Sequence, residues 1–141
     1  MGMSRGIGGP GEIQGQIQAM EAQKSELEGN KQHLKEAISD LRGRKSEIEG
    51  NIEELEAKMN QQLPPEFKAQ LAERVAMLKN ARQQIEGQIK DFENKLAMMS
   101  EARENIKQAI SARKSVLQQF AGVMAQKVAH LANREVGHPK G

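Results

Sequence analysis

Leu63-Pro64-Pro65-Glu66 interrupts two long helical patterns, and the fold follows from how the chain passes this point. Neither proline has a backbone N–H, and each disfavours the α region for the residue before it, so the preceding helix must end near Gln62. Pro65 suits the first turn of a second helix, because its φ is fixed and Glu66 lies at the positive helix N-terminus. We therefore predict a hairpin that reverses at a turn over Leu63, Pro64 and Pro65.

The composition is typical of long helices rather than of a compact globular core. Among the 141 residues there is no Trp, Tyr or Cys, and there are only 3 Phe. Ala, Glu, Lys, Gln, Leu, Ile and Arg dominate instead, as they do in coiled coils. The net charge of +2 is too small to indicate a polyanionic partner by itself. These features predict an all-α protein.

A first helix is predicted over residues 12–62, where apolar residues recur at alternating spacings of four and three. We call these the seam positions, and here they are Ile13, Ile17, Met20, Lys24, Leu27, Lys31, Leu34, Ile38, Leu41, Lys45, Ile48, Ile52, Leu55 and Met59. A period of 3.5 residues predicts a left-handed coiled coil. Three seam residues are Lys, whose stem can pack while the amine reaches water. This narrow, partly charged stripe favours pairs of helices over a four-helix bundle.

A second helix is predicted over residues 65–135, with the same spacing. Its seam positions are Leu71, Val75, Leu78, Arg82, Ile85, Ile89, Phe92, Leu96, Met99, Arg103, Ile106, Ile110, Arg113, Leu117, Phe120, Met124, Lys127 and Leu131. The expected fold is an antiparallel two-helix coiled-coil hairpin with unequal arms over residues 12–136. A flexible Gly-rich arm is expected over residues 1–11, and a tail over residues 137–141. The second helix should outlast the first by about 20 residues, which we call the overhang.

Opposite net charges favour pairing of the two helices with each other. Residues 12–63 carry 11 acidic and 7 basic side chains, whereas residues 65–136 carry 8 acidic and 12 basic ones. An antiparallel coil that sets basic seam residues opposite apolar ones can adopt either of two registers. In one register Lys45 lies near Ile85, and in the other it lies near Leu78. The sequence does not choose between them.

The overhang carries a broader apolar stripe than the rest of the chain. Its large apolar residues are Val116, Leu117, Phe120, Val123, Met124, Val128 and Leu131. An apolar face of this kind marks an interaction site when it is left in water. We expect it to bind protein, either another copy of this chain or other subunits of an assembly. The alternative is that residues 1–11 fold back and cover it.

Six glycines inside the predicted helices indicate a second surface. All of them fall at heptad position f, which points away from the seam: Gly15, Gly29, Gly43, Gly50, Gly87 and Gly122. Each glycine costs a helix about 0.8–1 kcal/mol relative to alanine. Either the outer positions tolerate any residue, or they form a smooth ridge that another helix approaches closely.

Nothing in the sequence indicates catalysis. The 3 histidines lack metal-ligand spacing and there is no Cys. The carboxylates lie on solvated helix faces, and a two-helix hairpin offers little concave interior. We expect no catalytic residue, metal, cofactor or small-molecule substrate.

Nucleic acid and membrane are also not expected as partners. Basic residues of the 65–135 helix are dispersed and lack the interleaved aromatics of a nucleic-acid site. No apolar run approaches the ~18 residues of a membrane span, and the first residues lack a signal-peptide pattern. We therefore expect a protein of the cytoplasm or of a soluble assembly.

These features together predict a non-enzymatic structural subunit that self-associates or packs within a larger protein assembly. The alternative is a soluble chaperone-like or export-stalk adaptor that presents the overhang to a partner. A third possibility is a homodimeric rod in which the prolines form a kink rather than a reversal. In shape, a long helical hairpin resembles flagellar and type III export stalk proteins, prefoldin subunits, and small viral scaffolding or minor capsid proteins. A resemblance of shape does not imply an activity.

Overall fold

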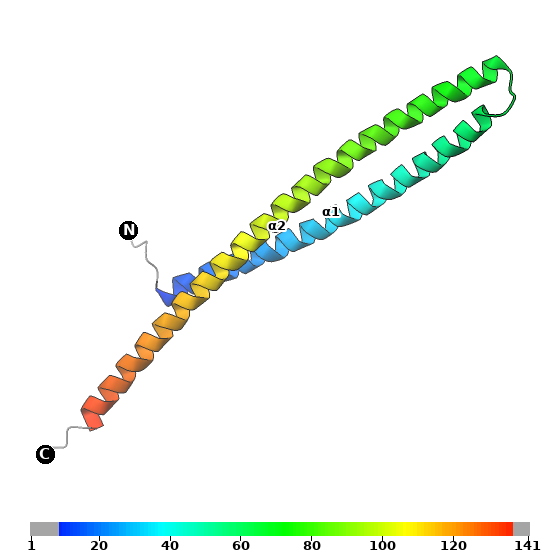
Figure 1. Cartoon of the computed structure of the whole chain (residues 1–141). Coiled ribbons are helices and arrows are strands. Elements are labelled where there is room, and N and C mark those ends of the chain that lie inside the picture. The colour runs from blue at the N-terminus through cyan, green and yellow to red at the C-terminus, as the bar shows by residue number, and fades with distance from the viewer. Residues whose placement is uncertain (1–8, 137–141) are drawn as a thin grey trace, which may run out of the picture. The chain divides into compact units, whose positions relative to one another are not determined.

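A computed structural model describes residues 9–136, with side chains for residues 9–133. Helix α1 spans Pro10–Met59 and helix α2 spans Pro65–Val136, and a short turn joins them (Figure 1). The two helices pack against each other within one chain, and the described residues contain no strand. The all-α prediction is therefore confirmed, and the arms are unequal, with 50 residues in α1 and 72 in α2.

Helix α1 begins two residues earlier than the sequence analysis placed it, at Pro10 rather than Glu12. The backbone N–H of Ile13 donates to the carbonyl of Gly9 at 3.1 Å, so Gly9 is the capping residue. Proline is well suited to the first helical position, where its missing N–H would have had no partner. The last two residues of the predicted arm therefore belong to α1, and the arm's residues 1–8 lie outside the described residues.

The turn that follows α1 occupies residues 60–64, because α1 ends at Met59, three residues before the expected end at Gln62. The N–H of Gln61 donates to the carbonyl of Lys58 at 3.1 Å. A bond to the third residue back tightens the last turn of a helix, as is common where a helix ends. The chain thus leaves the helix before it reaches the two prolines, as their steric effect on the preceding residue requires.

Helix α2 begins at Pro65, as predicted. The carbonyl of Pro64 accepts the N–H groups of Phe67 and Lys68, at 3.0 and 3.2 Å. Pro64 therefore caps the helix that Pro65 opens, which explains why two adjacent prolines suit this point. The helix ends at Val136, and the expected tail over residues 137–141 lies outside the described residues.

Contacts between residues divide the chain into two units. The first, which we call the turn unit, comprises residues 29–101 and contains the end of α1, the turn and the first part of α2. Its core is formed by Ile38, Leu41 and Ile89, with Ile85, Phe92 and Leu96 packed against them. All six are seam positions. Three ion pairs join the two helices beside this core, namely Arg42 with Glu93, Lys45 with Glu86, and Lys79 with Glu56.

The contacts in the turn unit match one of the two registers that the sequence allowed. The Nζ atom of Lys45 lies 3.2 Å from a carboxylate oxygen of Glu86, the residue next to Ile85. Leu41 shares the core with Ile89, one helical turn further along α2. Both contacts agree with the register that sets Lys45 near Ile85, and they disagree with the register that sets it near Leu78.

The second unit, which we call the terminal unit, is described over residues 9–28 of α1 and 102–136 of α2. Ile17 and Ile110 are buried in it. Two ion pairs join its helices, with 2.7 Å between Arg103 and Glu28 and 3.5 Å between Lys114 and Glu21. Arg113 also donates to the side-chain oxygen of Gln16 at 3.0 Å.

Candidate protein-interaction site

Burial in both units follows the seam positions. The buried residues are Ile17, Ile38, Leu41, Ile52, Val75, Ile89 and Ile110. Lys127 of the overhang is exposed, and the other basic seam residues are partly buried: Lys24, Lys31, Lys45, Arg82, Arg103 and Arg113. Such side chains can pack their aliphatic stems between the helices while the charge stays in water. The sequence pattern therefore located the contact face of both helices correctly.

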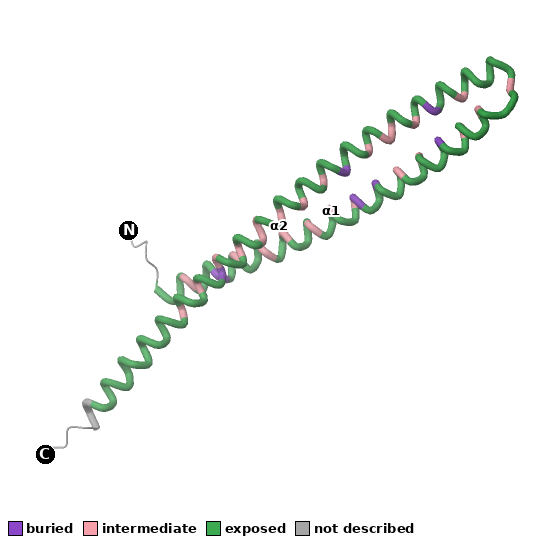
Figure 2. Tube along the Cα trace, in the orientation of Figure 1, coloured by how far each residue is buried: buried purple, intermediate pink, exposed green. Residues whose placement is uncertain are grey.

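In the terminal unit, burial ends close to the point where α1 begins. Ile13 and Leu117 are partly buried, and every described side chain of α2 beyond Leu117 is exposed (Figure 2). The exposed fraction rises from 37% at Phe120 to 62% at Val128. The overhang predicted from the unequal arms is thus a helix with no packed neighbour among the described residues.

The predicted apolar face lies on this uncovered part of α2. Six of its seven residues are exposed: Val116, Phe120, Val123, Met124, Val128 and Leu131. Leu117 is the exception, because it lies at the boundary and is half-buried. Of the segment that the sequence offered as a possible cover, residues 9–11 are exposed at the start of α1, and residues 1–8 lie outside the described residues.

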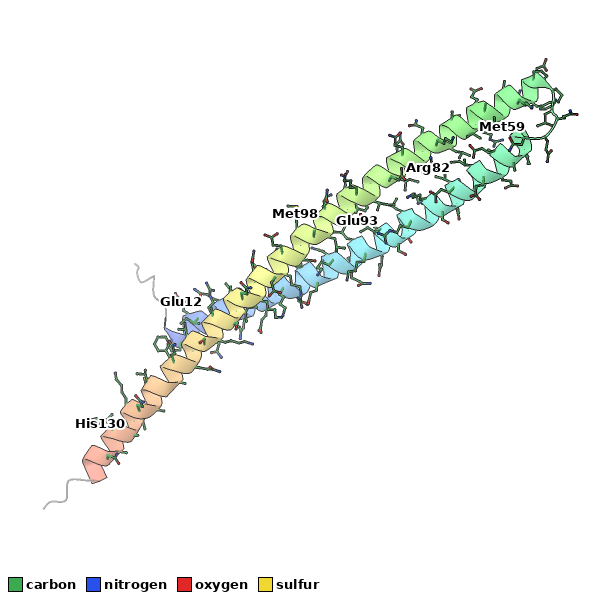
Figure 3. All side chains as sticks on the ribbon, viewed as in Figure 1. Glu12, Met59, Arg82, Glu93, Met98 and His130 are labelled. Carbon is green, nitrogen blue, oxygen red and sulfur yellow. The ribbon has the colours of Figure 1, made fainter. Side chains whose placement is uncertain are left out.

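The overhang also differs from the paired helices in its charge. There is no Asp or Glu between Glu104 and Glu135, and Lys127 is the only Lys or Arg between Ser115 and Asn133. In the paired part of the terminal unit, by contrast, basic residues of α2 are matched by carboxylates of α1, as in the pair Lys114 and Glu21. Figure 3 shows His130 on this weakly charged stretch of α2. The overhang is consequently less suited to water than the rest of the chain.

The six glycines of the proposed ridge are all exposed. A methyl group built at any one of them would meet no described atom within 4 Å beyond the adjoining backbone of its own helix. The glycines therefore do not make room for another described part of the same chain. Whether they make room for another chain stays a prediction.

Three further apolar side chains are exposed, and the sequence analysis did not single them out. They are Phe67, Met77 and Met98. Phe67 lines a shallow hollow at the turn together with Leu63 and Leu71. All three lie off the seam, and this feature of the sequence could have identified them. They are isolated from one another along the helix, unlike the residues of the overhang.

The described residues contain no group of three or more His, Asp or Glu placed to hold a metal ion. No helix in the described part is both long and apolar enough to cross a lipid bilayer.

The fold is therefore that of an all-α hairpin whose second arm carries an apolar face that the other described residues leave exposed. Comparison of the chain with protein-family models, with curated proteins and with solved structures finds no match.

Proposed function

We propose that this chain is a non-enzymatic structural coiled-coil subunit that associates through the overhang, with copies of itself or within a larger protein assembly. The exposed face between Phe120 and Leu131 is the observation that carries this proposal. Burial of apolar surface contributes roughly 25 cal/mol per Å², so covering this face favours association. We place the protein in the cytoplasm or a soluble assembly, with protein partners and without a substrate or cofactor.

The remainder of the chain supports a spacer-like role. Most of its large apolar residues are buried or partly buried within each unit, because the seam positions of α1 and α2 pack against each other. Exposed ion pairs such as Arg42 with Glu93 line the edges of the packed helices. A hairpin satisfied in this way presents mainly polar surface, which leaves the overhang as the strongest site for association.

The glycine ridge has a second role in this proposal. Gly29, Gly43 and Gly50 lie on the outward face of α1 with open space around them. Close approach of two helices is easiest where side chains are smallest, so this ridge suits lateral packing against a neighbouring subunit. It would act after association through the overhang rather than replace it.

The alternative function is a soluble chaperone-like or export-stalk adaptor. The same exposed face supports it, because a single chain could present Phe120 and its neighbours to a foreign protein. The two functions differ in what the isolated protein does. A structural subunit self-associates when alone, whereas an adaptor stays monomeric until it meets its partner.

Sedimentation equilibrium of the purified chain tests the proposal. We expect the unmodified protein to form an oligomer, and the Phe120→Glu variant to be monomeric because a carboxylate cannot be buried in the apolar contact without a partner. Met98→Glu is the matched control, since Met98 is an exposed apolar residue of the turn unit. Circular dichroism should show equal helix content in all three proteins.

Two results would contradict the structural proposal. A monomeric unmodified protein would favour the adaptor. An oligomer that Phe120→Glu leaves intact would place the association outside the overhang.

A further inference from the structure

Four seam positions lie on the uncovered part of α2: Phe120, Met124, Lys127 and Leu131. Their spacings are four, three and four residues, so the order of spacings is the same in both chain directions. In an antiparallel pair of overhangs, each of these four seam residues can therefore lie opposite a seam residue of the second copy. Phe120 then lies opposite Leu131 of the second copy, and Met124 lies opposite Lys127 of the second copy.

We propose that the overhang of one copy binds the overhang of a second copy, antiparallel, about a two-fold axis that passes between Ala125 and Gln126. This inference rests on the proposed self-association and specifies its geometry. Among antiparallel registers, it is the one that pairs all four exposed seam positions with one another. Closed two-fold pairing of identical surfaces is also the commonest form of homo-oligomer.

The charge of Lys127 favours the antiparallel arrangement over a parallel one. In a parallel pair, each lysine would face its own counterpart, with no Asp or Glu between Glu104 and Glu135 to neutralise them. Like charges placed opposite each other are destabilising. In the antiparallel pair Lys127 faces the apolar Met124 instead. A lysine is also set into the seam of the turn unit, where the amine of Lys45 pairs with Glu86 at the edge, although no such carboxylate lies beside Lys127.

The positions that flank the seam of the overhang carry no charges that would repel an identical helix. In coiled coils these flanking positions are usually charged and determine which helices pair. In the overhang they are Ala121, Val123, Val128 and His130, without any Asp, Glu, Lys or Arg. The antiparallel geometry sets Val123 beside His130 and Ala121 beside Val128, and these contacts add apolar area to the interface.

The start of α1 fits this arrangement. Ile13 and Leu117 are partly buried in the terminal unit, and Phe120 is the first exposed seam residue beyond them. The second copy would therefore pack on the seam of α2 from Phe120 onward, one helical turn beyond the last contact with α1. Only the residues that follow Asn133 in the second copy would lie opposite the part of α2 that α1 already contacts.

Cysteine pairs in the full-length chain test the orientation, because the natural sequence has 0 Cys. Val123→Cys and His130→Cys chains should form a disulfide-linked dimer when they are mixed and oxidised. Neither variant should cross-link alone. Residue 123 lies beside residue 130 of the second copy, so two copies of residue 123, or two copies of residue 130, are seven residues apart. This distance is roughly 10 Å along the axis, beyond the ~7 Å Cα separation that a disulfide allows.

Leu131→Cys supplies the opposite outcome. A parallel pair would bring two copies of this residue together, whereas in the antiparallel pair they would be offset by eleven residues, or roughly 16 Å along the axis. Rapid cross-linking of Leu131→Cys with itself would therefore overturn the antiparallel geometry. A protein that sediments as an oligomer but gives no product from the mixed Val123→Cys and His130→Cys chains would also overturn it, while leaving the proposed self-association intact. A monomeric unmodified protein would remove both proposals.

Discussion

The Nζ atom of Lys45 in α1 lies 3.2 Å from the carboxylate of Glu86 in α2, although Lys45 occupies a seam position. The lysine side chain is 31% exposed, so its stem lies between the helices while its charge reaches the edge. This contact explains how a basic residue is accommodated in an apolar seam, and it fixes which part of α2 lies beside it.

Replacing this lysine with an apolar residue should stabilise the hairpin. In Lys45→Leu, full burial of the leucine side chain should raise the free energy of unfolding by roughly 1–2 kcal/mol. The lost ion pair is exposed and contributes only about 0.2–1 kcal/mol. Urea unfolding followed by circular dichroism measures the difference. The control is Lys90→Leu on the exposed face of α2, which should give no gain; equal effects in both variants would contradict the seam assignment.

The core of the turn unit should be sensitive to truncation of a single side chain. Ile89 is buried against Ile38 and Leu41, so Ile89→Ala should lower the free energy of unfolding by about 2–5 kcal/mol. Met98→Ala, at an exposed position of the same helix, should change it by less than about 0.5 kcal/mol. Thermal and urea unfolding compare the two. Similar losses would mean that the seam is not the main source of stability.

Charge reversal tests the register. Arg42 pairs with Glu93 across the two helices, so Glu93→Lys should destabilise the hairpin slightly. The double variant Arg42→Glu with Glu93→Lys should recover the loss, with a coupling energy of about 0.2–1 kcal/mol, because both side chains are exposed. Raising the salt concentration should shrink the coupling. If the free energy of unfolding of the double variant equals the value expected from adding the effects of the two single changes, this pairing is contradicted.

Replacing a single glycine with alanine measures the effect of the glycine on helix stability apart from any effect on assembly. Gly43→Ala should stabilise the isolated chain by about 0.8–1 kcal/mol, since the new methyl group meets no atom within 4 Å. The measurement is thermal unfolding of the variant and the unmodified chain under conditions where both have the same sedimentation mass. A loss of stability would show a contact at this glycine that the structure does not contain.

The ridge itself is tested by larger side chains. Replacement of Gly29, Gly43 and Gly50 with Glu should raise helix content and prevent lateral assembly, because the carboxylates would keep a neighbouring helix at a distance. Light scattering reports the assembly and circular dichroism the helix content. Unchanged assembly in this triple variant would remove the ridge from the proposal.

The proline pair made the reversal predictable, since the steric rules for Pro64 and Pro65 leave few alternatives. The start of α1 lies two residues before the approximate start predicted at Glu12, because the Gly-Pro-Gly series before Glu12 reads as a helix breaker although Pro10 fits a first helical turn. The register was also beyond the sequence, because both alternatives set a basic residue against an apolar one. Packing of Leu41 with Ile89 distinguishes them.

The overhang was predictable for a different reason. Unequal arms leave one end of α2 without a neighbour, and the broad stripe around Phe120 marks that end as apolar. The apolar face is exposed in the structure. The identity of its partner depends on a second molecule, which this chain does not describe. The sequence could not separate a second copy from a foreign protein, because the weakly charged flanks of the overhang admit either.

The central claim is that the overhang holds subunits together, and the most direct test is the native mass of two proteins by sedimentation. One is the full chain, and the other ends at Ser115 and so lacks the apolar face. We predict an oligomer for the full chain and a monomer for the shortened one. Equal masses for the two proteins would contradict the claim.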